Sequence, residues 1–258
     1  MLFDMREKKH ADKQNDQMVF GMRPVMEAIK AGKEIDSILV QKGLKGENLN
    51  ELMDLIHERK LHLKRVPSDR LNRMTRKTHQ GVICFISPIS YARLEDVLPT
   101  IYESGKDPLI LLLDGITDVR NFGAIVRTAE CAGVDAIVIP ESGGARVTSD
   151  AIKTSAGALN IVAVCRTKEI VDAIRMVKDS GLNVVACTEH GKNDIYKSDF
   201  NQPVAVILGS EETGISKACL DLADQVVGIP IKGQIKSLNV SVAAGVVLYE
   251  AIRQRAIS

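Results

Sequence analysis

The sequence predicts an α/β protein with two parts, a small α/β unit followed by a larger domain built on a parallel sheet. Three observations support this prediction. From about residue 107 onward, short apolar runs alternate with helical patterns, which is typical of strands buried on both faces. The first 90 residues also alternate helix and strand, but they are far more basic. Apolar residues make up 45% and charged residues 26% of the 258, which is ordinary globular usage and excludes collagen, coiled coil and general disorder.

The chain begins with a polar segment and a compact basic unit. Residues 1–17 have mixed charge and no apolar run, which predicts a flexible tail and no signal peptide. Residues 18–88 predict a small α/β sandwich. Its expected elements are a helix from Pro24 to a cap at Gly32, a strand at 35–40, an amphipathic helix at 48–60, and strands at 61–66 and 81–86. Residues 89–106 contain Pro, Ser and Gly around a short helical stretch and are expected to be the linker between domains.

The domain at 107–258 carries the repeated strand and helix pattern. Apolar runs predict strands at 109–113, 136–139, 161–164, 184–186, 204–208 and 226–229. A helix at 121–132 has an apolar stripe of Phe122, Ile125, Val126 and Ala129. The last helix has a stripe of Val240, Ala243, Ala244, Val247, Leu248 and Ala251. The site of such a sheet is expected at the carboxyl ends of its strands.

Several functional classes are excluded by absent patterns. The five cysteines are scattered without a CxxC pair, which argues against a disulfide framework or a zinc cluster and for reduced, buried thiols. No GxGxxG, GxxxxGK[ST] or HExxH motif occurs, so a standard dinucleotide site, a P-loop and that metal site are not expected. The apolar runs are too short to cross a bilayer. The sequence therefore predicts a cytoplasmic protein with no metal and no membrane partner.

Charge is distributed unevenly along the chain. Residues 1–90 have a net charge of +5 and residues 91–258 a net charge of −4, although the total is only +1. Between Arg59 and Lys77 there are eight basic residues and one acid; the basic residues are Arg59, Lys60, Lys64, Arg65, Arg70, Arg73, Arg76 and Lys77. Such a run is either a solvated helix face or a surface for RNA phosphates, and the steep imbalance favours phosphate binding.

Three polar segments follow predicted strands. Motif 1 (residues 114–127) leads into a helix near Asn121 and includes Arg127. Motif 2 (residues 208–216) has glycines at 209 and 214 around Glu211 and Glu212. Motif 3 (residues 229–241) connects a strand to the last helix. Taken singly, each motif is also compatible with a plain loop and a helix cap, since Asn121, Ser216, Ser237 or Asn239 could cap a helix start.

Taken together, the three motifs resemble those of the SpoU/TrmH family of RNA ribose 2′-O-methyltransferases, within the SPOUT superfamily. The patterns N-x₅-R, G-x-E-x-x-G and I-P-x₆-S-L-N-x-S occur in the family's order, and the likeness covers about residues 108–255. The first unit, with Phe20-Gly21 at its start and His79-Gln80-Gly81 at its end, is similar to the ribosomal-protein-like substrate-binding domain of the branch that modifies 23S rRNA. The transfer-RNA branch usually lacks that domain.

The resemblance implies a trefoil knot in the C-terminal domain, a homodimer, S-adenosylmethionine as cofactor, and methylation of a ribose 2′-hydroxyl in RNA, expected to be a guanosine of 23S rRNA. A tRNA 2′-O-methyltransferase and a non-catalytic RNA-binding or ribosome-assembly protein are the alternatives. Carried over by motif position, the cofactor contacts are Thr188, Leu208, Gly209, Ile229, Ile231 and Leu238. The catalytic set is Asn121, Arg127, Glu211, Ser237 and Asn239. Glu212 and Lys236 depart from the family's usual small residues and put substrate fit in question.

Roles for these residues follow from their chemistry. The cofactor supplies the reactive methyl group, so the protein must bind, orient and help remove a proton. Because a guanidinium keeps its proton, Arg127 is expected to clamp a phosphate and stabilise the developing alkoxide; it could act as base only if it were desolvated and held near another cation. Asn121 would position Arg127, and Glu211 would order motif 2 or pair across a dimer. Ser237 and Asn239 would shape motif 3. The small residues Ala243, Ala244 and Gly245 are expected to allow close approach of a second subunit.

Overall fold

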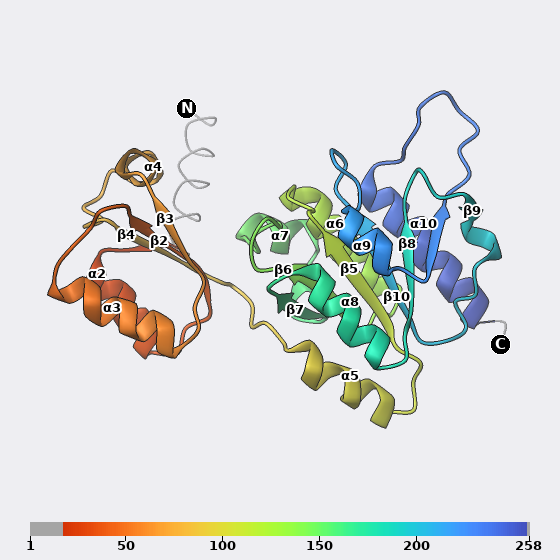
Figure 1. Cartoon of the computed structure of the whole chain (residues 1–258), viewed down its shortest axis with the longest axis horizontal. Coiled ribbons are helices and arrows are strands. Elements are labelled where there is room, and N and C mark those ends of the chain that lie inside the picture. The colour runs from red at the N-terminus through yellow and green to blue at the C-terminus, as the bar shows by residue number, and fades with distance from the viewer. Residues whose placement is uncertain (1–17, 257–258) are drawn as a thin grey trace. The chain divides into compact units, whose positions relative to one another are not determined.

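The computed structural model describes residues 18–256, so the tail expected at residues 1–17 lies outside the described residues. The described chain forms two compact units, and the boundary between them falls after Ser90. Figure 1 shows the path of the chain through both units, with element labels that are used throughout.

The first unit is a four-stranded sheet with helices on both faces (Figure 1). Its elements in chain order are β1 (Met18–Phe20), α2 (Met22–Lys30), β2 (Ile35–Gln41), α3 (Glu47–Glu58), β3 (Leu63–Val66), α4 (Ser68–Met74) and β4 (Val82–Ile86). The strand order is β1-β4-β2-β3; β4 is antiparallel to both of its neighbours, and β3 is parallel to β2. The predicted α/β sandwich is therefore what the described residues form.

Two apolar clusters hold this sheet between its helices. On one face, α2 and α3 bury Val25, Ile29 and Leu52 against Ile38 and Val40 of β2. On the other face, α4 buries Leu71 against Leu39, Val66 and Ile83. The predicted helix stop at Gly32 is also observed: α2 ends at Lys30, Gly32 takes a φ of 68°, and the N–H of Lys33 donates to the carbonyl of Ala28.

The second unit is a seven-stranded parallel sheet. Its helices and strands are α5 (Leu94–Glu103), β5 (Leu109–Asp114), α6 (Val119–Cys131), β6 (Ala136–Pro140), α7 (Ser149–Thr154), β7 (Ala163–Thr167), α8 (Ile170–Asp179), β8 (Asn183–Cys187), β9 (Asn193–Asp194), β10 (Val204–Gly209), α9 (Lys217–Leu222), β11 (Gln225–Gly228) and α10 (Val240–Arg255). The strand order is β7-β6-β5-β10-β8-β11-β9, and every neighbouring pair is parallel. The expected α/β fold with a parallel sheet is confirmed, and the knot stays a prediction.

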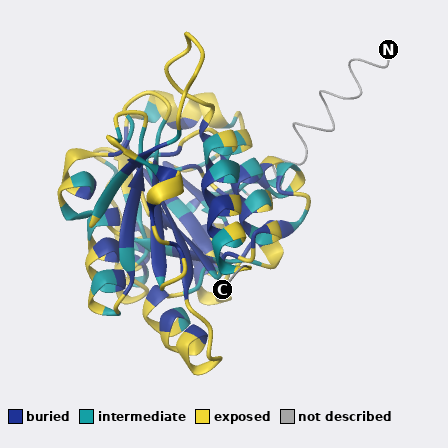
Figure 2. Cartoon of the chain, turned by 90° about the vertical axis from the view of Figure 1, so that its right-hand side faces the viewer, coloured by how far each residue is buried: buried dark blue, intermediate teal, exposed yellow. Residues whose placement is uncertain are grey.

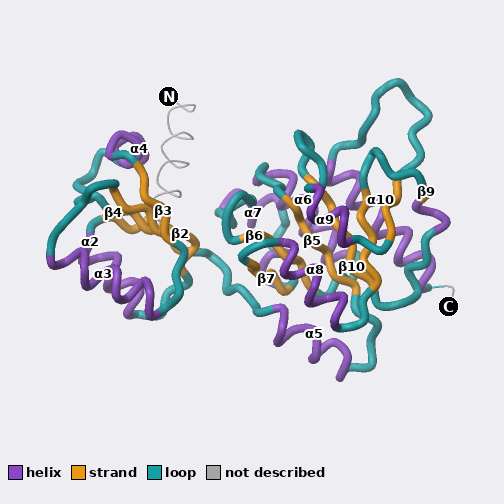
Figure 3. Tube along the Cα trace, in the orientation of Figure 1, coloured by secondary structure: helices purple, strands orange, loops and turns teal. Residues whose placement is uncertain are grey.

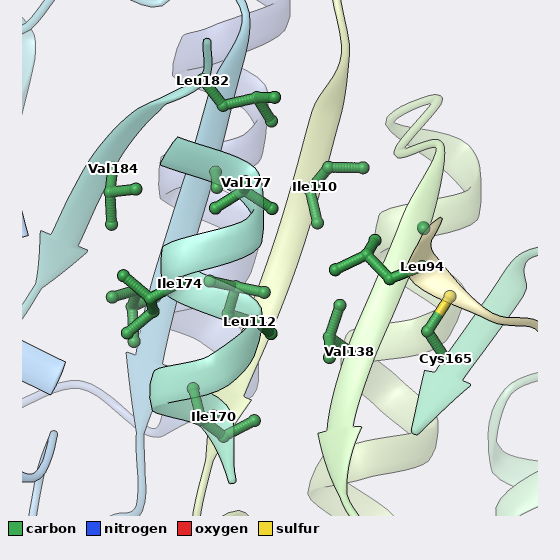
Figure 4. Close-up of a cluster of buried hydrophobic side chains, with 14 of the residues drawn as sticks. Leu94, Ile110, Leu112, Val138, Cys165, Ile170, Ile174, Val177, Leu182 and Val184 are labelled. Atoms are coloured by element: carbon green, nitrogen blue, oxygen red, sulfur yellow. The ribbon is translucent and has the colours of Figure 1, made fainter. Parts of the chain in front are cut away.

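Helices cover both faces of this sheet (Figure 3). One face packs against α5, α8 and α9; Figure 4 shows Ile170, Ile174 and Val177 of α8 against Ile110 and Leu112 of β5. The other face carries α6 and α10, which pack on each other. Every side chain of Leu109–Leu113 is at most 2% exposed, as the continuous apolar run predicted. Figure 2 shows this buried centre and its exposed rim of loops.

Helix α10 is fixed at its carboxyl end by polar contacts. The guanidinium of Arg255 donates to the carbonyl oxygens of Asp107, Pro108, Phe200 and Gln202, at 2.8–3.1 Å. Partial burial lowers the pKa of Arg255 from its ordinary value. These acceptors lie in the segments that lead into β5 and β10, so the end of α10 is tied to the start of the two central strands.

Two local expectations differ from the structure. The segment 89–106 is not a linker along its length, because Leu94, Leu98 and Ile101 of α5 belong to the buried core of the second unit. The strand expected at 161–164 begins only at Ala163, and Ile161 before it is 72% exposed. This strand, β7, lies at the edge of the sheet and includes the polar Arg166. These segments were misassigned because a short apolar run does not reveal which element it packs against.

Two of the small residues of α10 lie at its contact with α6 inside the chain. Ala244 is fully buried, and a methyl group added at Gly245 would lie 3.8 Å from Cγ2 of Thr128 in α6. They permit close packing of α10 on α6. The expectation that this helix approaches a second subunit stays a prediction.

The cysteines give a direct test of this packing. All five are free thiols, four are buried and Cys131 is exposed, so Cys131 departs from the expected buried set. Burial raises the pKa of Cys84 and Cys187 to about 12, and of Cys165 and Cys219 to about 11.

Because the thiolate is the reactive form, only Cys131 should react quickly with Ellman's reagent at about pH 8. Denaturation should release the other four, and Cys131→Ser should remove the fast phase. A second fast thiol in the native protein would contradict this assignment.

Candidate active site

Two of the three motifs begin side by side because their strands are neighbours. β5 and β10 pair in parallel register, with Leu113 opposite Leu208 and Asp114 opposite Gly209. Motif 1 and motif 2 therefore leave the sheet at the same edge and the same level. Motif 3 leaves the sheet after β11, on the same edge, two strands further along.

Motif 2 is a closed turn that depends on Gly209. Ser210 and Gly214 exchange two backbone hydrogen bonds, at 2.9 and 3.2 Å, which bring the chain back on itself. A Cβ at Gly209 would lie 2.2 Å from the carbonyl carbon of Gly214, so no other residue fits without moving the backbone. The turn is tied to motif 1 by the N–H of Ser216, which donates to Asp114 at 2.7 Å.

Glu211 joins all three motifs. Its Oε1 accepts from Nδ2 of Asn121 at 3.1 Å, from Nδ2 of Asn239 at 2.5 Å, and from the N–H of Val240 at 3.3 Å. Asn239 also donates to Oδ1 of Asn121 at 3.0 Å. Glu211, Asn121 of motif 1 and Asn239 of motif 3 are thus joined pairwise by hydrogen bonds, and these three residues form the Glu211 triangle.

This triangle changes the expected role of Asn121 and keeps that of Asn239. Asn121 does not cap its helix: Asp118 is the N-cap of α6 and accepts from the N–H groups of Arg120 and Asn121 at 2.8 Å. The amide of Asn121 is free to reach Glu211 and Asn239, and no hydrogen bond joins it to Arg127 in the described chain. Asn239 is the N-cap of α10, as the sequence allowed, and accepts from the N–H of Ser241.

Arg127 lies nearly two turns along α6 from Asn121. It is exposed, opposite the buried stripe of Phe122, Ile125 and Val126 that packs α6 on the sheet. Within residues 18–256 its guanidinium has no hydrogen bond or ion pair. A guanidinium that is not neutralised by a carboxylate can bind a phosphate.

A cavity of about 630 Å³ opens beside the triangle. It is lined by the loops after β8, β10 and β11, and all six expected cofactor contacts line it: Thr188, Leu208, Gly209, Ile229, Ile231 and Leu238. Glu211, Ser237 and Asn239 of the expected catalytic set line it as well, whereas Asn121 and Arg127 do not. The cavity therefore gathers nine of the eleven positions carried over from the motifs.

The loop after β8 contributes a wall that the residues alone did not single out. Glu189 and His190 line the cavity, and the backbone of Thr188 is fixed by its N–H, which donates to the carbonyl of Val227 at 2.9 Å. A Cβ at Gly191 would lie 2.1 Å from the carbonyl carbon of Val227, so the loop lies directly on β11. A glycine shortly after a buried strand was the available signal for this close approach.

The basic cluster of the first unit is exposed to solvent. Each of the eight residues from Arg59 to Lys77 is exposed, and none forms a salt bridge in the described part of the chain. Arg59 and Lys60 follow α3, Arg70 and Arg73 lie one turn apart on α4, and Lys77 lies 5.3 Å from the centre of the Phe20 ring. Unpaired exposed cations of this density produce a positive field that attracts polyanions.

Comparison with known proteins identifies the family. Residues 108–249 match the SpoU rRNA Methylase family, and residues 18–92 match the domain described as RNA 2'-O ribose methyltransferase substrate binding. The chain belongs to the SpoU rRNA methylase family. It is therefore an RNA methyltransferase with a substrate-binding domain, and the alternative of a non-catalytic RNA-binding protein is set aside.

Two relatives match nearly the whole chain, and a third matches about two thirds of it. A Staphylococcus saprophyticus protein named for the TrmH family of tRNA/rRNA methyltransferases is 32% identical over 92% of this chain and 96% of its own length. The SpoU methyltransferase AviRb from Streptomyces viridochromogenes, crystallised with AdoMet, is 26% identical, with a TM-score of 0.59 over 93% of this chain and 91% of its own. The TrmH/SpoU tRNA modifying enzyme of A. aeolicus is 30% identical, with a TM-score of 0.54 over 64% of this chain and 85% of its own.

Two kinds of feature are absent from the described residues. No group of three or more His, Cys, Asp or Glu side chains between residues 18 and 256 is arranged to hold a metal ion. No helix in that range is both long and apolar enough to cross a bilayer.

The Glu211 triangle predicts a difference between two substitutions at one position. All three donors converge on Oε1, so Glu211→Gln keeps the acceptor, whereas Glu211→Ala leaves three donors without it. We expect Glu211→Ala to lower the free energy of unfolding by about 1 kcal/mol, below the usual contribution of a hydrogen bond to a charged group because the side chain is exposed. Glu211→Gln should lose less than half of that. Urea unfolding of both variants measures the difference, with the neighbouring Glu212→Ala as control. Equal losses for Ala and Gln would contradict the single-oxygen geometry.

Proposed function

We propose that this protein transfers a methyl group from S-adenosylmethionine to a ribose 2′-hydroxyl of ribosomal RNA, at a guanosine of 23S rRNA. The observation that carries the proposal is that motifs 2 and 3 line one cavity at the carboxyl edge of the sheet, and that Glu211 of this lining is hydrogen-bonded to Asn121 of motif 1. An RNA substrate of this kind places the reaction in the cytoplasm.

The cavity suits the proposed cofactor. A volume of about 630 Å³ lies in the range of small-molecule sites. Leu208, Ile229 and Ile231 offer apolar surface for an adenine ring, while the bare backbone at Gly209 allows close approach of a ligand. Cys187 lines the cavity as a neutral thiol, since burial raises its pKa to about 12, so it does not compete for the methyl group. When bound, the cofactor supplies an electrophilic methyl group.

The chain's own residues then bind and orient the hydroxyl. Asn121, Glu211 and Asn239 hold the three motifs in one arrangement, so the ribose meets a site that is already formed. Ser237 lies on the cavity wall beside Asn239 and can donate to or accept from the ribose. Arg127 binds the neighbouring phosphate, and its positive charge stabilises the alkoxide that develops as the 2′-oxygen loses its proton.

Ribosomal RNA is favoured over transfer RNA by the first unit. The AviRb structure matches 93% of the chain, whereas the tRNA modifying enzyme matches 64%, a share close to that of the second unit alone. The substrate-binding domain at residues 18–92, which lies largely outside that match, supports the proposal of a substrate other than tRNA.

The working enzyme is proposed to be a homodimer, and Arg127 of one subunit would complete the cavity of the other. Arg127 lies outside the cavity lining of its own chain, so the cavity of a single chain lacks the guanidinium that the proposed mechanism uses. On α10, Val242 and Tyr249 are more than half exposed and offer apolar surface for a partner. Light scattering that shows only a 28.1 kDa species would refute the dimer.

The assay that tests the function uses tritium-labelled S-adenosylmethionine and three unmodified transcripts: 23S rRNA, 16S rRNA and a tRNA pool. We expect label in 23S rRNA, in a nucleotide that resists alkaline cleavage because its 2′-oxygen is methylated. Label confined to tRNA would overturn the choice of substrate, and label in an alkali-sensitive nucleotide would overturn the ribose assignment.

Arg127→Ala should abolish methyl transfer and leave cofactor affinity within a few-fold. The reason is that Arg127 faces solvent on α6, while the expected cofactor contacts come from the loops after β8, β10 and β11. Arg127→Lys keeps the charge but not the planar fork, so it should recover part of the rate. Single-turnover rates and isothermal titration with S-adenosylmethionine separate the two effects. Normal turnover in Arg127→Ala would remove this residue from the mechanism.

The basic cluster should carry much of the RNA affinity. Replacing Arg70, Arg73, Arg76 and Lys77 by Ala should weaken RNA binding and flatten the slope of log K against log[salt], by about 0.7 for each phosphate that is no longer bound. Cofactor binding should be unchanged, and all RNA sequences should be affected alike. A matched control is Arg175→Ala with Lys217→Ala, two exposed cations already paired with Asp172 and Asp221. An unchanged salt slope in the quadruple variant would mean that the cluster is only a solvated surface.

A further inference from the structure

The rim loop (residues 231–236) combines an exposed apolar side chain with two lysines. Ile235 is 79% exposed, the highest value among the large apolar side chains of the described residues. Lys232 and Lys236 flank it, both exposed, and no acid occurs between residues 229 and 241. The loop that precedes α10 rises clear of the second unit in Figure 1, and its exposed residues are yellow in Figure 2.

The rim loop borders the cavity without filling it. Lys236, Ser237, Leu238 and Asn239 line the cavity, whereas Ile235 does not. Ile235 therefore lies outside the cavity lining, next in sequence to Lys236, which belongs to it. Motif 2 contributes Glu211 and Glu212 to the cavity lining, and their negative charges repel phosphates. An RNA strand is therefore expected to bind on the side of the cavity where Lys232 and Lys236 lie.

A nucleotide that reacts inside a cavity must leave the stack of its neighbours. Enzymes that act on single nucleotides meet a cost of a few kcal/mol for unstacking. Many proteins that bind the minor groove of DNA insert an apolar side chain as a wedge between base steps. Lysine and arginine side chains bind phosphates of nucleic acids through their charge. An exposed isoleucine between two lysines, at the mouth of a cavity, has this chemistry.

We propose that Ile235 is a positioning residue that inserts into the RNA base stack beside the target nucleotide, while Lys232 and Lys236 bind the flanking phosphates. This inference rests on the proposed function, since it assumes an RNA ribose in the cavity. The competing occupant is a second copy of the chain. The lysines on both sides argue against that occupant, because the cores of protein interfaces are depleted of lysine.

The test uses the nucleotide that the wild-type enzyme methylates. A short RNA fragment carrying that nucleotide is made with 2-aminopurine as its neighbour, whose fluorescence rises when stacking is lost. Wild-type enzyme should raise the signal. Ile235→Ala should lose most of that rise and lower kcat by about tenfold or more, with cofactor affinity and subunit mass unchanged. Ile235→Leu should restore both. Lys232→Ala with Lys236→Ala should raise KM and flatten the salt dependence of binding.

Ile161→Ala is the matched control, because Ile161 is 72% exposed in the same unit but does not line the cavity. It should match wild type in fluorescence and rate. Ile235→Ala with a full fluorescence rise and normal kcat overturns the wedge while leaving the methyltransferase assignment intact. Loss of the dimer in Ile235→Ala assigns Ile235 to a subunit interface and also overturns the wedge. A wild-type enzyme that methylates no RNA overturns both proposals.

Discussion

The parallel pairing of β5 with β10 is the constraint on which the site depends. Because Asp114 and Gly209 lie opposite each other at the ends of these strands, motifs 1 and 2 leave the sheet at one level. The same pairing fixes α6, whose buried stripe packs on the sheet, and thereby fixes Asn121 at the start of that helix. Glu211 then reaches Asn121 without backbone strain at either residue, since neither has a positive φ. A shift of β10 by one residue would turn its side chains to the opposite faces and separate these groups.

Helix α10 fixes the position of motif 3 relative to these two strands. Its carboxyl end is held by Arg255 on four carbonyl oxygens, and its amino end begins at Asn239, which is bonded to Glu211. The small residues Ala244 and Gly245 let the helix pack closely on α6 between these two ends. With both ends fixed, Ser237 and Leu238 lie against the cavity, while the rim loop before them extends into solvent.

Local packing was predictable from the residues, and part of the cavity wall was predictable from the family resemblance. The run Leu109–Leu113 predicted a buried central strand, and Phe122, Ile125, Val126 and Ala129 predicted the face that α6 buries. The motif positions also predicted the six apolar and backbone positions that line the cavity. The errors have a common origin: Asn121 was a plausible helix cap and α5 a plausible linker. In each case the residue type was compatible with two partners, and only packing chose between them.

The sequence by itself determined which residues are apolar at which spacing, and therefore the order of helices and strands, the parallel sheet and the two-part organisation. These properties follow from local periodicity, because burial of one face is decided within a few residues. The tertiary structure alone decided that Glu211 bonds Asn121, 90 positions before it, and Asn239, 28 positions after it. The physical reason is that a polar side chain can satisfy its hydrogen bonds equally well at a nearby helix end or on a distant strand, so its partner is fixed only when the register of the sheet brings those atoms within about 3 Å.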